Sequence, residues 1–285
     1  MKKTISNQTF DEERALYNLE NYSVINCNFA GAKDGESVLK ECRKIDIENC
    51  SFSLRYPIWH AKKFVLKNSK MDDKTRAPLW YSNDGVIESS KVEGIKCLRE
   101  CKNILIQNSI INSDEFGWRC KKLKIENSEI NSVYFLFESK DVEIDNLKIN
   151  GKYSFQYMKN LHIENSNLDT KDAFWHSKNI VVENSFVKGE YLGWFSENLT
   201  FINCTIEGTQ PLCYAKNLKL INCKMINCDL AFEYSDVNAD IKGKIDSVKN
   251  PKSGIITADI IGEIINEKPV IKCGCKIEIN NPALV

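Results

Sequence analysis

One pattern of apolar and polar positions recurs through most of the chain. It runs apolar, any residue, apolar, any residue, Asn, then Ser or Cys, any residue and apolar, as in LHIENSNL at residues 161–168. Other copies are IDIENCSF at 45–52, LKIENSEI at 123–130 and LKLINCKM at 218–225. The asparagine position of each copy is occupied by Asn26, Asn49, Asn68, Ser89, Asn108, Asn127, Asn146, Asn165, Asn184, Asn203 and Asn222, at spacings of 23, 19, 21 and then seven times 19.

The alternation within each copy predicts a β-strand with one buried face, because successive side chains of a strand point to opposite sides. Strands that return every 19 residues with the same face buried, and with no helical pattern between them, require a coil whose turns stack on one another. We therefore predict an all-β fold, a single-stranded right-handed parallel β-helix of about 11 to 12 rungs. The right hand follows the general rule for parallel crossovers.

The recurring asparagine marks a corner of this coil. Asn tolerates the left-handed backbone conformation that a sharp corner needs. Its amide can also donate to and accept from identical neighbours about 4.8 Å away on adjacent turns. We expect an internal Asn ladder that satisfies buried polar groups at the corner.

The extent of the repeat sets the domain organisation. It covers about 200 residues, which favours a single domain over residues 1–285. Regular rungs are expected over residues 21–235. An open coil end would expose unpaired strand edges, so residues 1–20 are expected to form an N-terminal cap. Residues 236–285 are expected to form irregular final rungs and a C-terminal cap.

Charge and composition narrow the cellular setting. Lys plus Arg and Asp plus Glu both number 39, so the net charge gives no reason to expect a nucleic acid or an anionic membrane as partner. The N-terminus lacks the apolar run of a signal peptide and no stretch is long enough to span a membrane, which predicts a cytoplasmic protein. The 12 cysteines are expected to be reduced, because several of them occupy a position that other copies fill with Ser.

A second repeated segment lies between the copies, and its chemistry varies from turn to turn. One of its columns contains all five tryptophans and reads Trp59, Trp80, Arg99, Trp118, Phe137, Gln156, Trp175, Trp194 and Cys213. The next column reads His60, Tyr81, Glu100, Arg119, Glu138, Tyr157, His176, Phe195 and Tyr214. Strands with a purely structural role would need only aliphatic and small polar residues here.

Two interpretations of this stripe remain open. In the first it is structural: the tryptophans form a stacked core, Arg99 lies between Trp80 and Trp118 as a cation–π sandwich, and the next column is a self-neutralising ladder of charges. In the second it is a groove for an extended glycan, since exposed rings can cover the C–H surfaces of sugars and charges can bind acidic substituents.

The glycan interpretation rests on aromatic residues beside like charges. Arg55 over Arg76 and Lys152 over Lys171 would repel each other unless an anion or a carboxylate lies between them. The predicted substrate-binding residues are Arg55, Trp59, His60, Arg76, Trp80, Trp118, Lys152, Lys171, Trp175 and Trp194.

The same stripe supplies catalytic groups if the protein is an enzyme. The predicted catalytic residues are Glu100, Arg119, Glu138, Asp172, His176 and Glu190. Carboxylates one or two rungs apart suit the acid and base roles of glycoside hydrolysis, and a histidine can transfer protons near neutral pH. The arginine could stabilise developing negative charge. No metal or other cofactor is required by the sequence, since Cys273 and Cys275 lack further ligands at suitable spacing.

The rung pattern is similar to that of the pectin-lyase-like superfamily of parallel β-helices, over residues 20 to about 265. More closely, the bacterial domain-of-unknown-function family numbered 3737 resembles this chain over nearly its whole length, in the strings RYPIWH, GIKCLRECKN, EFGWRC, GKYSFQY, LDTKDAFWH, GEYLGWFS, GTQPLCY, DLAFEYSDV and SVKNP. The superfamily implies polysaccharide lyases, hydrolases and esterases, whereas the closer family implies no activity.

These observations predict a carbohydrate-active or carbohydrate-binding protein whose partner is an oligo- or polysaccharide. If it is an enzyme, a polysaccharide lyase or a glycoside hydrolase is expected. The alternative is a non-catalytic scaffold, either structural or for protein interaction.

Overall fold

The computed structural model describes residues 1–31 and 36–280, and these residues form strands and turns without any helix. Among them, accordingly, no helix has the length and apolar character needed to cross a lipid bilayer. The chain forms two compact units, residues 1–143 and residues 144–285. The prediction of a single domain over the whole chain stays a prediction.

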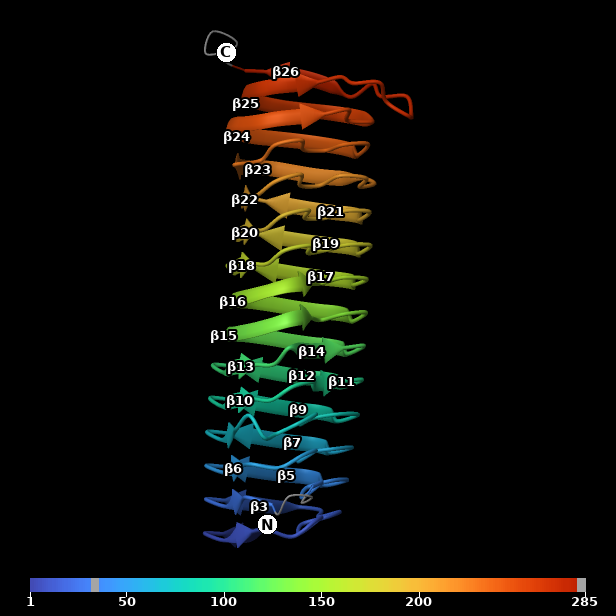
Figure 1. The fold of residues 1–285 in the computed structure, drawn as a ribbon. Coiled ribbons are helices and arrows are strands. Elements are labelled where there is room, and N and C mark those ends of the chain that lie inside the picture. The colour runs from blue at the N-terminus through green and yellow to red at the C-terminus, as the bar shows by residue number, and fades with distance from the viewer. Residues whose placement is uncertain (32–35, 281–285) are drawn as a thin grey trace. The chain divides into compact units, whose positions relative to one another are not determined.

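The first unit is a stack of parallel strands, each paired with a strand one turn further along the chain (Figure 1). Its strands are β1 (Lys3–Ser6), β2 (Thr9–Phe10), β3 (Tyr22–Ile25), β4 (Asn28–Phe29), β5 (Arg43–Glu48), β6 (Ser51–Phe52), β7 (Lys62–Lys67), β8 (Lys70–Met71), β9 (Asn83–Glu88), β10 (Lys91–Glu93), β11 (Cys97–Arg99), β12 (Lys102–Gln107), β13 (Ile110–Asn112), β14 (Glu115–Trp118) and β15 (Lys121–Phe135). The register keeps the predicted copies opposite one another, as when Ile45 pairs with Phe64.

The second unit repeats this arrangement. Its strands are β16 (Lys140–Ser154), which begins before the boundary between the units, β17 (Lys159–Glu164), β18 (Asn167–Asp169), β19 (Lys178–Glu183), β20 (Phe186–Lys188), β21 (Glu197–Ile202), β22 (Thr205–Glu207), β23 (Leu218–Ile226), β24 (Asp236–Lys249), β25 (Ser253–Ile265) and β26 (Lys276–Ile279). Successive strands are again parallel, with Leu161 opposite Ile180. The predicted all-β parallel solenoid is therefore confirmed.

The stack extends further toward both ends of the chain than expected. Strand β1, within the segment expected to form a cap, pairs in parallel with β3. Strands β24 and β25, within the segment expected to be irregular, pair over most of their length with a single register shift between Ile241 and Lys244. The structure has about 14 turns, against the 11 to 12 rungs predicted, because residues 1–20 contribute strands and the final rungs are more regular than expected.

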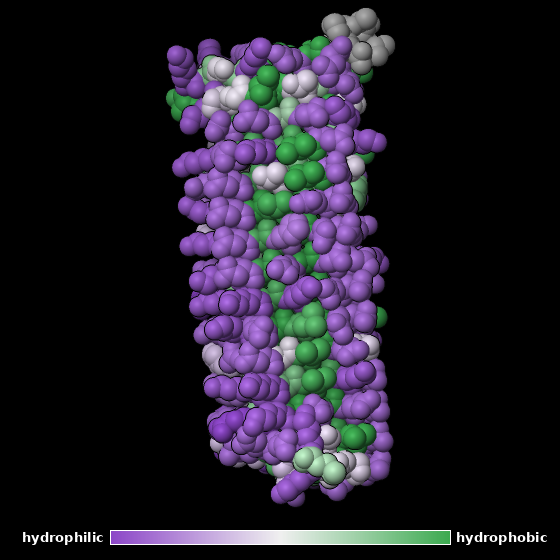
Figure 2. Space-filling model, turned by 180° about the vertical axis from the view of Figure 1, so that it is seen from behind, coloured by the Kyte–Doolittle hydropathy of each residue, from purple (hydrophilic) through white to green (hydrophobic). Residues whose placement is uncertain are grey.

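Each unit has a core of inward-facing apolar side chains that stack from turn to turn. In the first unit the rings of Phe29 and Phe52 are 4.8 Å apart. In the second unit Phe155 and Phe174 stack at 4.9 Å with planes 8° apart. The alternate side chains point outward, so most of the face in Figure 2 is polar and apolar side chains reach that surface in a narrow strip.

The asparagine ladder forms, but it is exposed, which corrects the prediction of an internal ladder. Asn203 has a positive φ of 53°, as the corner requires. Its Nδ2 donates to Oδ1 of Asn184 at 3.1 Å, and Asn222 donates to Asn203 at 2.8 Å. These side chains face solvent. The residue after each asparagine points into the coil instead, so the ladder satisfies amides on the surface.

The next residue, Ser or Cys, is the buried polar group of this corner. Ser69 Oγ accepts from the Cys50 backbone N–H at 3.1 Å and donates to the Lys67 carbonyl at 2.8 Å. A cysteine can replace the serine, since Cys50 Sγ accepts from the Cys27 N–H at 3.4 Å. All 12 cysteines lie within the described residues and are free thiols, as predicted. Burial raises the pKa of the Cys50 thiol to about 11.

Candidate functional site

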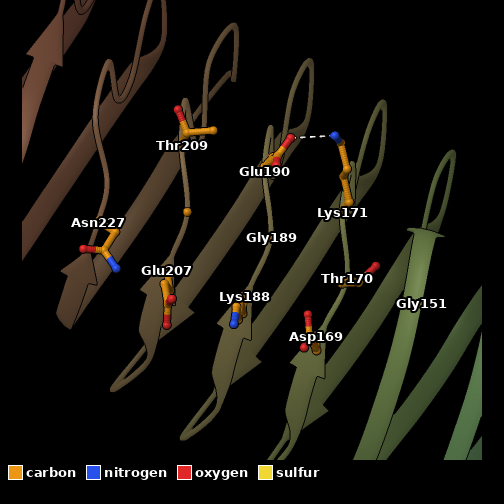
Figure 3. A pocket seen from close by; sticks show the side chains of 11 residues that line it. Gly151, Asp169, Thr170, Lys171, Lys188, Gly189, Glu190, Glu207, Thr209 and Asn227 are labelled. Atoms are coloured by element: carbon orange, nitrogen blue, oxygen red, sulfur yellow. Dashed lines mark ion pairs between the residues drawn. The ribbon is translucent and has the colours of Figure 1, made fainter.

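The second unit contains a groove of about 480 Å³ that runs across neighbouring turns (Figure 3). It is lined by Gly151, Asp169, Thr170, Lys171, Lys188, Gly189, Glu190, Glu207, Gly208, Thr209 and Asn227. The lining falls into three columns, because each position recurs after 19 residues. Thr170, Gly189 and Gly208 form the floor. Asp169, Lys188 and Glu207 form one wall, and Lys171, Glu190 and Thr209 form the other.

The floor contains glycine because successive turns approach one another too closely for a side chain. A Cβ atom on Gly208 would lie 2.0 Å from the carbonyl oxygen of Gly189. Gly208 also has a φ of +133°, a conformation that L-residues rarely adopt. In glycine a Cα hydrogen occupies this place and can lie against the Gly189 carbonyl oxygen, whereas the Cβ of any other residue would collide with that oxygen. The absence of side chains at Gly189 and Gly208 makes the surface hollow.

The two walls differ in how their charges are paired. On one wall Lys171 Nζ forms an ion pair with Glu190 at 2.5 Å, and this hydrogen bond raises the pKa of the lysine. On the other wall Asp169, Lys188 and Glu207 occupy paired positions on successive strands. None of these three side chains forms an ion pair with any residue that the structure describes. The second wall therefore presents available charges to the groove.

The tryptophan column lies at the surface as a stacked ladder. In the first unit Trp59 and Trp80 stack at 5.3 Å with planes 7° apart, and in the second unit Trp175 and Trp194 stack at 5.5 Å and 3°. All four are half-buried. The ring faces contact one another, so a ligand would reach mainly their edges.

Hydrogen bonds fix this ladder to the backbone of the next turn. Each indole Nε1 donates to a carbonyl there, for example Trp175 to Tyr191 at 2.6 Å. Gln156 takes the place of an indole and donates its Nε2 to the Asp172 carbonyl at 2.9 Å. This pattern explains why Gln can occur in a column of tryptophans.

The predicted cation–π sandwich is present in the first unit. The Arg99 guanidinium lies 4.5 Å from the centroid of Trp80 and 5.0 Å from that of Trp118. It also donates to Glu115 at 3.1 Å. Arg99 thus continues the ladder with its charge neutralised, as the structural interpretation of the stripe expects.

The predicted catalytic residues divide between the two units. In the first, Arg119 Nε donates to Glu138 at 2.7 Å on an exposed surface, and Glu100 lies near enough to influence the guanidinium electrostatically. In the second, exposed His176 is stacked between Tyr157 and Phe195, 5.0 Å from each ring. None of these four residues lines the groove, and their catalytic roles stay predictions.

Glu190 and Lys171 are the two predicted residues that line the groove. Of the other predicted binding residues, Arg55 has a carboxylate neighbour, Glu36 at 3.7 Å, and exposed His60 stacks on Tyr81 at 4.9 Å. Arg76 and Lys152 are exposed. In the pair of Lys152 and Lys171, Lys171 has a carboxylate neighbour in Glu190, which lies on the turn after Lys171 and not between the two lysines. The roles of all these residues in binding substrate stay predictions.

Asp172 is 7% exposed and lies next to the Lys171–Glu190 pair in sequence and space. Burial, followed by the charge of Glu190, raises the pKa of this carboxyl, while Lys171 and Lys152 oppose the shift. The native state therefore holds this proton more tightly than the unfolded chain does. The contribution of Asp172 to the free energy of unfolding therefore becomes unfavourable as the pH rises above the ordinary Asp range of about 4.

We expect Asp172→Asn to melt at a higher temperature than the native protein at pH 7 and at the same temperature near pH 3. Asparagine tolerates the φ of 52° at this position and carries no charge to desolvate. Thermal unfolding at both pH values measures the effect, with Glu164→Gln as a control for removing one negative charge from the same unit. A difference in melting temperature that is equal at both pH values would contradict this explanation.

Sequence reasoning missed Asp169, Lys188 and Glu207, together with the glycine floor. A usable signal was present, because Gly151, Gly189 and Gly208 fall in a single column of the 19-residue repeat. Repeated glycine in a coil indicates close backbone approach and a missing side chain.

Comparisons with known proteins give a family and a fold. The family model described as "Protein of unknown function (DUF3737)" matches residues 3–279. A search of curated protein sequences found no significant match. Among solved structures, PfbA, a surface adhesin of Streptococcus pneumoniae, is 10% identical with a TM-score of 0.53, over 95% of this chain and 87% of that chain. The A-module of mannuronan C-5 epimerase AlgE6 from Azotobacter vinelandii is 12% identical with a TM-score of 0.48, over 98% and 86%.

Proposed function

The chain belongs to the DUF3737 family of proteins of unknown function, and we propose that it binds an extended glycan in the groove of its second unit. The observation that carries this proposal is the form of the groove, which has a backbone floor between two polar walls. A hollow that continues across several turns suits a linear polymer better than a compact metabolite. Sugar-binding sites need convergent polar groups at fixed positions, and a stacked solenoid places one such group per wall on each turn.

The rigidity of the walls supports binding of a polyhydroxylated ligand. One wall consists of the last residues of strands β18, β20 and β22, whose registers fix the spacing between turns at about 4.8 Å, and the other wall lies two residues further along each turn. Carboxylate and ammonium groups held at such spacing can make charge-assisted hydrogen bonds to sugar hydroxyls without a large ordering cost. The aromatic ladder lies next to the groove. Tyr191 connects the two, because it lies beside Lys171 and packs against Trp194.

A glycan array tests this proposal. We expect the native protein to bind at least one class of oligosaccharide, and Lys188→Ala with Glu207→Ala to weaken that binding by more than tenfold. The matched control is Lys219→Ala with Glu164→Ala, which removes one lysine and one glutamate from strands outside the groove. Absence of glycan binding by the native protein would contradict the proposal, and equal loss in both double variants would contradict the location.

Catalysis is a second candidate function, favoured by the positions of three carboxylates. Glu190 is displaced from Asp169 and from Glu207 by one turn along the stack and two residues across it, about 8 Å at the backbone. Carboxyl groups about 6.5–9.5 Å apart suit inverting hydrolysis of glycosides. Incubating the bound glycan with native protein and with Glu190→Gln tests this role. Release of shorter products by the native protein alone supports it, and no release by either leaves a binding role.

A further inference from the structure

The charges on the walls of the groove indicate which class of glycan it binds. Asp169, Lys188 and Glu207 alternate in sign along one wall, and they form no ion pair within the described part of the chain. Asp169 and Lys188 are exposed and Glu207 is half-buried. These three groups are therefore available to a ligand, and two of them are carboxylates.

The opposite wall has little capacity left for a charged ligand. Lys171 is held by Glu190 at 2.5 Å, so the two charges cancel locally. Thr209 Oγ1 donates to Asp229 Oδ1 at 2.5 Å, which places another carboxylate next to the groove. Together the charged lining residues are three carboxylates and two lysines, with a net charge of −1.

This arrangement discriminates between glycans by their charge. A polyuronate carries a carboxylate on every sugar, so it would place anions beside Asp169 and Glu207 and would find one available lysine. Like charges brought together in a partly desolvated groove repel one another. A neutral sugar chain can instead donate hydroxyl protons to the two carboxylates and accept from the ammonium group, which matches all three available groups.

We infer that the groove selects an uncharged, hydroxyl-rich glycan and rejects polyuronates. This inference rests on the proposed glycan-binding function and identifies the class of ligand. It also reverses the expectation of acidic substituents raised by the pairs of like-charged residues in the sequence, because the lysine of the groove that was expected to bind such a substituent is neutralised by Glu190.

Binding measured by titration calorimetry at two salt concentrations tests the inference. The probes are neutral hexasaccharides of glucose, mannose and galactose with different linkages, and the hexamers of galacturonate and mannuronate. The native protein is expected to bind at least one neutral probe at least tenfold more tightly than either uronate. Its affinity for the neutral probe should be almost unchanged between low and high salt, because screening acts only on charged ligands.

Variants that remove charges from the wall provide a control, because removing the carboxylates and removing the lysine should change uronate binding in opposite directions. Asp169→Asn with Glu207→Gln should weaken the neutral probe about tenfold and strengthen the uronates, whereas Lys188→Gln should weaken both classes. Both sets change exposed or half-buried side chains without an ion-pair partner in the described residues, so folding should be retained and circular dichroism can verify it.

Tighter binding of a uronate than of any neutral probe by the native protein would overturn the inference but leave the glycan-binding function standing. Binding of no probe of either class, and of no array glycan, would overturn both.

Discussion

Gly208→Ala is expected to destabilise the second unit by about 3 kcal/mol or more, because it combines backbone strain with a clash that cannot be relieved. The added Cβ would lie 2.0 Å from the Gly189 carbonyl oxygen and 2.7 Å from its carbon, and both are backbone atoms. The φ of +133° adds strain for any residue with a side chain. Relief would require the turns to separate, which would break the strand pairing on either side of the groove.

The urea midpoint of unfolding measures this effect, with Gly274→Ala as the matched control. Gly274 belongs to the same unit and has no heavy atom within 4 Å of an added Cβ. We expect its substitution to change stability by less than about 1 kcal/mol. If the two variants unfold at the same urea concentration, the close approach of turns at the groove floor does not exist in solution.

Phe174→Ala is expected to lower the free energy of unfolding by about 3–5 kcal/mol, the usual range for removing a buried phenylalanine ring. Phe174 is completely buried, stacks on Phe155 at 4.9 Å and contacts Phe201 at 6.1 Å between ring centroids. A parallel coil cannot close the resulting cavity easily, since the paired strands on both sides keep the turns at a fixed spacing.

Phe174→Leu is the informative comparison for this prediction. Leu98, Leu136 and Leu212 occupy the same column in other turns, with φ values of 59°, 58° and 63° against 64° at Phe174. The leucine variant should therefore lose less than about 1.5 kcal/mol. Thermal or urea unfolding of both variants gives the values. Equal destabilisation by alanine and leucine would show that ring stacking, rather than filled volume, dominates the core.

The fold could be predicted from the sequence because its determinants are local and repeated. Alternation within each copy fixes which face of a strand is buried, and the 19-residue return fixes the stacking. The orientation of Asn203 was predicted wrongly, since a polar residue that recurs in a repeat can satisfy its neighbours equally well inside or outside the coil. A positive φ is found both at this exposed asparagine and at the buried Phe174, so the left-handed conformation that the sequence implies does not decide between the two.

Less of the candidate site than of the fold could be predicted from the sequence. Trp175 and Glu190 attract attention as residue types that carry chemistry, yet the hollow surface arises from Gly189 and Gly208, which carry no side chain. The depth of a groove depends on what is missing and on the spacing of turns, neither of which follows from residue chemistry alone. The sequence predicted an anion or a carboxylate between Lys152 and Lys171, because like charges on adjacent turns repel one another. The carboxylate that pairs with Lys171 is Glu190, on the following turn.

The central claim is that the glycan lies in the groove of the second unit, and amide hydrogen exchange tests it most directly. Exchange would be measured for the native protein alone and with a saturating amount of the tightest glycan from the array. We predict slower exchange in the three segments that line the groove, residues 169–171, 188–190 and 207–209. Protection confined to other parts of the chain, such as the segments around Trp59 and Trp118, would contradict the claim.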